Sequence, residues 1–353
     1  MAPGGRVDKN MRAYDFSAHN KTVKRDKSRY FSYAFIILLV AALAAFIYYV
    51  VLNSPRILYY FRENKYSEIE RLHAQAIESL PTAVKAAKDT LAQGDVADFL
   101  DLSRSLQKDH REDPILHFHE ATLLDEILRR QIADQSPALL ALLFRDFIGR
   151  PQFAREFDQE IWQRALLTGR RARALGLPEV LSQKLAEAEV DVYLLGGKPW
   201  WESAQQLVQA NSPAKKLPAW HLMQAGLTRE TPDFELIKTA YGASLATFAK
   251  GVYYTRSGNS PLGISSFRDL AKSETDAFAR DHALYALAHL SARDKRIRDQ
   301  LSYLRQIRFA EFAPSYPHFV PEYNYLLRFL GSKSEADQMM KAWEDLKTST
   351  ARP

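Results

Sequence analysis

Residues 30–52 read YFSYAFIILLVAALAAFIYYVVL, and this stretch decides how the chain is organised. It holds 23 residues without a formal charge, and Ala34–Leu52 contains only Ala, Phe, Ile, Leu, Val and Tyr. In a helix, a run of this last length spans roughly 28 Å at about 1.5 Å per residue, which is close to the hydrocarbon thickness of a bilayer. The sequence therefore predicts one transmembrane helix from Tyr30 to Leu52.

Two other kinds of segment have a similar composition. A core helix of this length in a soluble protein normally carries a polar face, and Ala34–Leu52 has none. A cleaved signal peptide has an apolar run of about 7 to 15 residues followed by a small-x-small cleavage pattern. The present run is longer and no such pattern follows it. We therefore expect a permanent membrane anchor.

The charges that flank the anchor predict its orientation. Residues 10–29 contain six Lys or Arg, whereas residues 53–72 contain four. Because the more basic flank stays in the cytoplasm, we expect residues 1–29 to form a basic, disordered cytoplasmic tail. The remaining chain has no cysteine and no N-x-S/T sequon, a composition typical of bacterial periplasmic domains. The expected location is thus the bacterial inner membrane, with the C-terminal domain in the periplasm.

The net charge of +6 is concentrated in this tail. Residues 1–29 hold eight basic groups and three Asp, a net of +5, so the rest of the chain sums to about +1. A folded part without a basic excess is poorly suited to neutralise phosphates along a nucleic acid. We therefore expect no nucleic-acid partner.

Apolar spacing after the anchor predicts a helical stalk over residues 53–80, with a kink at Pro55. Beyond Pro81 the pattern favours successive helices of about 12 to 20 residues, without strand alternation. Proline is tolerated in the first turn of a helix, where its missing N–H leaves no bond unmade. The prolines at expected helix starts are Pro81, Pro114, Pro137, Pro151, Pro178, Pro199, Pro218 and Pro261.

A repeat-like motif lies in the C-terminal half. Its residues are Gly251, Tyr254, Gly258, Gly263 and Phe267. With this G-x2-Y-x3-G spacing and the residues that follow it, the segment 244–277 resembles a tetratricopeptide repeat. The resemblance implies that the first Gly lets two helices pack closely, that the Tyr fills the groove between them, and that the second Gly turns the chain.

The same resemblance is weaker elsewhere. Gly331 and Ala336 have the right spacing within residues 278–349, residues 81–133 match loosely, and residues 134–243 are merely helical. We therefore expect an all-α protein in which residues 81–349 form a solenoid of stacked helix pairs. A compact, irregular helical bundle is the alternative architecture.

The sequence offers little for catalysis, metals or cofactors. His110, His117 and His119 lie near Asp113 and Glu120, but neighbours two apart on a helix point to nearly opposite faces and H-E-x-x-H is absent. Phosphate-loop and dinucleotide-binding motifs are also absent. We predict no catalytic residue, no metal site and no cofactor.

Lytic transglycosylases are an enzymatic comparison for a periplasmic helical solenoid. Their catalytic Glu lies in an E-S motif a few tens of residues ahead of a G-L-M-Q motif. This chain has Glu78-Ser79 and Leu222-Met223-Gln224, but more than 140 residues separate them. Both fragments are better explained as coincidence.

Aromatic clusters near helix breaks are the candidate partner-binding residues. They are Trp200, Trp201, Tyr316, Phe319 and Tyr323, and Tyr325 belongs to the same C-terminal cluster. Aromatic anchors commonly dominate protein interfaces, although the same residues can instead wedge helix pairs together. The basic run Arg170, Arg171 and Arg173 can meet an acidic partner or simply form a solvated helix face.

These observations favour a non-catalytic scaffold or assembly factor that binds other proteins of an envelope, secretion or flagellar-motor complex. The resemblance to tetratricopeptide repeats implies protein partners. One rival is a periplasmic chaperone that grips extended peptides, and another is an envelope enzyme that acts on peptidoglycan. The sequence leaves the oligomeric state open.

Overall fold

The computed structural model describes residues 15–54, 67–133, 136–150, 158–210, 212–273 and 275–350. Helix is the only regular secondary structure in these residues, so the predicted all-α class is confirmed. The Pro55 kink and the part of the tail ahead of Asp15 lie outside them. Contacts divide the chain into two units, residues 1–68 and residues 69–353.

The first unit contains one long helix, α1 (Asp15–Leu52). Its segment Phe31–Leu52 is long and apolar enough to cross a membrane, with a mean hydropathy of 2.9 and no residue buried against protein. This agrees with the predicted segment to within one residue. The disorder predicted up to residue 29 is wrong for the described part of the tail, because α1 already begins at Asp15. Residues 15–29 contain neither Gly nor Pro, so a helix formed in the apolar run can propagate through them.

The second unit begins earlier than expected. Helix α3 (Ser67–Ser79) ends where the predicted stalk ends, but it buries Ile69 and Ala76 and groups with the helical domain. The Arg130 guanidinium donates to the Leu80 carbonyl and holds the chain after α3 against the next helices. The domain therefore starts at Ile69, rather than at residue 81.

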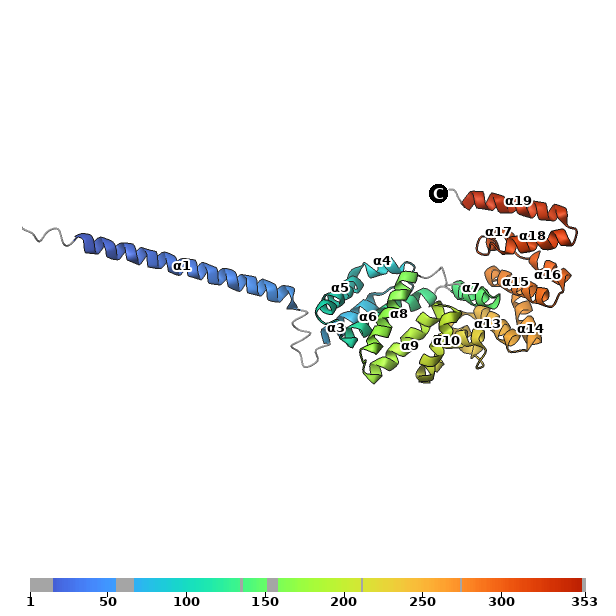
Figure 1. The fold of residues 1–353 in the computed structure, drawn as a ribbon, viewed down its shortest axis with the longest axis horizontal. Helices are drawn as coiled ribbons and strands as arrows, with labels where there is room; N and C mark the ends of the chain where they lie inside the picture. The colour runs from blue at the N-terminus through green and yellow to red at the C-terminus, as the bar shows by residue number, and fades with distance from the viewer. Residues whose placement is uncertain are drawn as a thin grey trace, which may run out of the picture. The chain divides into compact units, whose positions relative to one another are not determined.

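The helices of this domain follow one another in the colour order of Figure 1. They are α4 (Ala87–Leu91), α5 (Gly94–Asp109), α6 (Pro114–Ala133), α7 (Ser136–Phe147), α8 (Gln159–Ala174), α9 (Glu179–Leu195), α10 (Lys198–Ala210), the 3-10 helix η1 (Ser212–Lys216), α11 (Pro218–Leu227), α12 (Phe234–Tyr241), α13 (Ala243–Arg256), α14 (Ser260–Ala271), α15 (Ala277–Arg293), α16 (Ile297–Leu304), α17 (Phe309–Phe312), α18 (Phe319–Phe329) and α19 (Lys333–Thr350). Several are shorter than the expected 12 residues, notably α12 and α16.

Most of the prolines lie at helix starts, as predicted. Six of the eight occupy the first two helical positions or the residue just before a helix. Pro81 is an exception, because α3 ends just before it and the next helix starts only at Ala87. Pro151 lies outside the described residues.

From α12 to α16 each helix packs against the next one in chain order, and α16 packs on α18 and α18 on α19. This sequential packing is what a stack of helix pairs requires, because each pair leaves an apolar face that the next pair covers. The predicted pair within residues 244–277 is present as α13 and α14. Asp276 caps the following helix α15, its carboxylate accepting from the Ala279 N–H at 2.9 Å.

Two glycines set the contact between α13 and α14. A Cβ at Gly251 would lie 2.5 Å from the Phe267 ring, and one at Gly263 would lie 2.9 Å from the Gly251 carbonyl oxygen. Gly258 turns the chain with a φ of +91°. The resemblance implied that Tyr254 fills the groove between the two helices, but the structure places this side chain elsewhere. It packs on the Phe234 ring of α12, while Phe267 occupies the groove.

Helix α7 departs from the chain order of a simple solenoid. All ten residues from Ala138 to Phe147 are buried, and α7 packs against α6, α11, α13 and α15. In Figure 1 this green helix lies next to α13 and α15, although about 100 residues or more of sequence separate it from them. It forms part of the core around which the C-terminal helices are arranged.

Candidate partner-binding surface

Of the two tryptophans predicted to bind a partner, Trp201 is buried in the core and Trp200 is half-buried. Trp201 is 1% exposed, and its Nε1–H donates to the Leu194 carbonyl at 3.0 Å. Trp200 packs edge-on against Trp162, with ring centroids 5.2 Å apart, and against Gly196. Trp200 joins α10 to α8 and α9, and Trp201 joins α10 to α9 and α11, as the wedge alternative expects.

The three C-terminal aromatics of that prediction are also buried. The Tyr316 hydroxyl and His282 Nε2 are hydrogen-bonded at 2.7 Å. The Phe312 ring lies between Tyr316 and Phe319 and packs against both. The Tyr323 hydroxyl donates to a Glu335 carboxylate oxygen at 3.3 Å. These residues join α15, α17, α18 and α19, and their surfaces are not available to a partner.

Two of the histidines, His73 and His119, pack against each other, whereas His117 contacts Arg111 and Arg171. His73 of α3 lies edge-on to His119 of α6, with ring centroids 4.7 Å apart, and its Nε2 lies 3.1 Å from the Thr122 hydroxyl. Burial lowers the pKa of His73 to about 4 and that of His119 to about 3, so both rings are neutral at physiological pH. Within the described residues, no group of three or more His, Asp or Glu is arranged to hold a metal ion.

Two acidic side chains lie deep between α6, α8 and α9. Asp125 and Glu189 are 3% and 0% exposed. Burial raises the pKa of Glu189 to about 7 and that of Asp125 well above its usual range, the latter also because Glu189 lies nearby. Arg173 pairs with one oxygen of Glu189. Neither carboxyl lines any of the cavities described below, so their raised pKa values reflect packing in the core.

Exposed apolar side chains gather instead at the C-terminal part of the domain. Eight large apolar residues are exposed in the described part of residues 69–350: Leu167, Val180, Leu262, Phe278, Ile297, Tyr325, Phe329 and Leu330. Tyr325 and Phe329, four residues apart on α18, are 65% and 59% exposed. Their rings stack with centroids 5.9 Å apart and planes inclined by 21°.

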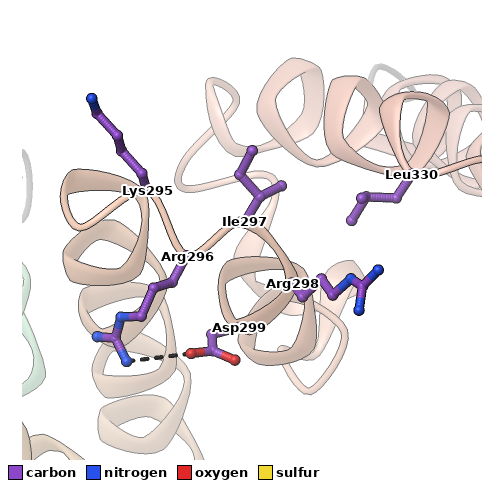
Figure 2. A pocket seen from close by; sticks show the side chains of 6 residues that line it. All are labelled: Lys295, Arg296, Ile297, Arg298, Asp299 and Leu330. Atoms are coloured by element: carbon purple, nitrogen blue, oxygen red, sulfur yellow. Dashed lines mark hydrogen bonds and ion pairs between the residues drawn. The ribbon is translucent and has the colours of Figure 1, made fainter.

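An open cavity of about 440 Å³ includes Leu330, the residue after this pair, in its lining. Its lining residues are Lys295, Arg296, Ile297, Arg298, Asp299 and Leu330. Leu330 directly follows Phe329, so the cavity continues from the end of α18 to the start of α16. Figure 2 shows Ile297 and Leu330 at this cavity, each from a different helix end. We call Ile297, Tyr325, Phe329 and Leu330, together with the basic groups of the cavity, the C-terminal surface.

The charges of this surface are mostly positive. Arg296 is neutralised by Asp294 at 3.2 Å and by Asp299 at 3.3 Å, and Figure 2 shows it turned toward Asp299. Lys295 and Arg298 have no carboxylate within ion-pair distance among the described residues. The surface therefore combines an apolar centre with two cations that lack acidic partners, a composition suited to a protein interface.

A helical wheel of α18 contains the signal that identifies this surface. Phe319, Tyr323 and Leu326 recur at spacings of four and three and are buried, which places Tyr325 and Phe329 on the opposite face. Aromatic density alone indicates the cluster that contains Tyr325, but it does not separate the exposed members from the buried ones. The basic groups were not recognisable from sequence, because their lack of partners depends on tertiary contacts.

Comparisons of the chain with protein-family models, with curated proteins and with solved structures give no match.

Proposed function

We propose that this protein is a membrane-anchored, non-catalytic scaffold or assembly factor that holds other proteins of a bacterial envelope complex. In this proposal Phe31–Leu52 is the anchor in the inner membrane and the helical domain stands in the periplasm. The observation that carries the proposal is the C-terminal surface, which exposes a stacked aromatic pair next to a cationic cavity.

The architecture supports this role. The packing of Gly251 against Phe267 and the sequential contacts from α12 to α19 fit a solenoid similar to tetratricopeptide-repeat proteins. Such stacks offer long surfaces on which one protein can arrange others. The buried α7 stiffens the stack from within, because a close-packed interior resists deformation.

Energetics favour an occupant for the C-terminal surface. Burying a Phe or Leu side chain contributes about 1.5 to 3 kcal/mol, so covering Tyr325, Phe329 and Leu330 gives a sizeable part of a protein-protein binding energy. Lys295 and Arg298 select the charge of that occupant. We propose as its partner a protein segment that presents apolar side chains flanked by Asp or Glu, because such carboxylates complement the two cations.

The test is quantitative cross-linking in intact cells, followed by purification of the full-length protein and mass spectrometry. Tyr325→Ser/Phe329→Ser removes the aromatic pair without touching the core. We expect a small, defined set of envelope proteins with the wild type and a loss of at least one of them with this variant. Lys295→Glu/Arg298→Glu should weaken capture of the same protein through charge repulsion.

The matched control is Leu167→Ser/Val180→Ser, which removes two equally exposed apolar side chains from α8 and α9. It should retain the wild-type set. Equal recovery from all variants would argue against the C-terminal surface as the docking site. A diffuse set of exported clients, unaffected by every variant, would instead favour a chaperone.

A further inference from the structure

A second open cavity, of about 420 Å³, lies between α5, α6 and α8. Its lining residues are Arg104, Gln107, Lys108, Arg111, His117 and Arg171. Four of these six side chains carry a positive charge and none carries a negative one. Neither the proposed scaffold function nor the C-terminal surface uses this cavity.

Local structure places three of the cations together. Arg104 and Lys108 are four residues apart on α5, and Arg111 follows in the turn after that helix ends at Asp109. Like charges at this spacing repel each other. The repulsion is only partly relieved, because Asp101 pairs with Arg104 at 3.2 Å on an exposed part of the helix.

Helix α8 supplies the fourth cation, Arg171, and this residue differs from two other arginines of the helix in its partners. Arg164 pairs with Glu120, and Arg173 pairs with Glu189. Arg171, which lines the cavity, contacts only uncharged groups. Its Nε lies 3.2 Å from His117 Nε2 and its Nη2 lies 3.3 Å from the Arg111 carbonyl oxygen.

Two of these contacts compete for one ring nitrogen of His117. His117 Nε2 also lies 3.1 Å from the Arg111 carbonyl oxygen. In one tautomer this nitrogen donates to the carbonyl, and in the other it accepts from the Arg171 Nε–H, so it cannot make both hydrogen bonds at once. Lys108 and Arg111 have no carboxylate within ion-pair distance among the described residues. The cavity is therefore rich in charged donors and poor in acceptors.

We propose that this cavity binds a phosphate group carried as a phosphomonoester. A guanidinium fork matches two phosphate oxygens, and such charge-assisted bonds are about twice as strong as neutral ones. A phosphate dianion neutralises the cations better than a single carboxylate does. It also gives the Arg171 Nε–H an acceptor and relieves the competition at His117.

The phosphate belongs either to a lipid headgroup or to a soluble molecule, and one experiment separates these sources. Full-length protein is placed in nanodiscs of phosphatidylcholine, and binding of inorganic phosphate is measured by calorimetry. The titration is repeated in nanodiscs that contain phosphatidic acid. Weaker apparent phosphate binding there identifies the lipid headgroup as a competitor for the cavity, whereas unchanged binding identifies a soluble phosphomonoester.

The decisive variant is Lys108→Glu/Arg111→Glu, which reverses two exposed charges that hold no described side chain in place. The variant replaces two charge-assisted donors with carboxylates that repel the anion, so we expect phosphate binding at least about tenfold weaker. Lys333→Glu/Lys341→Glu on α19 changes the net charge equally and should bind like the wild type. No phosphate binding by the wild type, or equal binding by both double variants, would overturn the proposal.

Discussion

Gly251 lies where the backbone of α13 meets the ring of Phe267, with no room for a methyl group. We predict that Gly251→Ala lowers the free energy of unfolding by about 1 to 3 kcal/mol, because overpacking forces the ring or the helix to move. Chemical denaturation followed by circular dichroism measures this loss. Ser265→Ala, on the exposed face of α14, should change stability by less than about 0.5 kcal/mol.

The same contact permits a stricter test. Phe267→Leu in the Gly251→Ala background makes room for the new methyl group, so the double variant should be more stable than the sum of the single losses predicts. Strict additivity of the two substitutions would show that Gly251 and Phe267 do not interact in the way described.

Glu189 makes the stability of the domain depend on pH. Burial raises its pKa from the usual 4.5 to about 7, so the folded state keeps a proton that the unfolded state releases. The contribution of Glu189 to the free energy of unfolding is therefore complete below about pH 4.5 and is lost as the pH rises through 7. At about 1.4 kcal/mol per pKa unit, the loss is on the order of 3 kcal/mol.

We predict that Glu189→Gln flattens this part of the pH profile between pH 5 and pH 7. Asp125 lies in the same core and burial also raises its pKa, so it contributes a slope of the same sign that remains in this variant. Denaturation series at several pH values provide the measurement, with Glu202→Gln on exposed α10 as the control that keeps the wild-type slope. A profile unchanged by Glu189→Gln would mean that this carboxyl is not the group responsible.

At the scale of helices, α7 holds together elements that are distant in sequence. Its Phe144 ring packs edge-on against Phe248 of α13, Tyr285 of α15 and Phe312 of α17, with centroids 5.6 to 6.3 Å apart. Asp146 of the same helix pairs with Arg256 of α13. The helix therefore links α13, α15 and α17 through one continuous set of contacts.

We predict that Phe144→Ala destabilises the domain by about 3 to 5 kcal/mol, the usual cost of removing a buried aromatic side chain. Hydrogen exchange should show protection of α13 and α15 falling together. Leu167→Ala, which removes an apolar side chain that is 65% exposed, serves as the control with little effect. Loss of protection in α7 alone would contradict its central position.

The helices were predictable from sequence to different degrees. The pair α13 and α14 was recognisable because Gly251, Gly258 and Phe267 are local signals. The position of α7 was not, because ten buried residues in a row indicate burial on all sides without naming the helices that provide it. The aromatic part of the C-terminal surface was predictable from sequence, because helical periodicity places Tyr325 and Phe329 on a different face of α18 from Tyr323. The proposed phosphate site depends on contacts of α8 with α6 and with the turn after α5, and sequence spacing does not reveal these contacts.

At the scale of the whole molecule, the proposed topology predicts that the C-terminal end of the chain lies outside the cytoplasm. Reporter fusions after Thr350 should show activity of alkaline phosphatase, which functions only outside the cytoplasm, and no fluorescence from a reporter that folds only inside it. The reverse pattern would place the helical domain in the cytoplasm. Resistance of the protein to extraction from membranes by alkaline carbonate tests the anchor separately, with a peripheral protein as the control.

The central claim is that the C-terminal surface holds a partner protein, and site-specific photo-crosslinking in intact cells tests it most directly. A photoreactive amino acid is placed at Phe329 in one strain and at Leu167, equally exposed on α8, in another. The account predicts a discrete cross-linked band at position 329 that position 167 lacks and that Lys295→Glu/Arg298→Glu weakens. No protein adduct at position 329, or the same adducts at both positions, would contradict it.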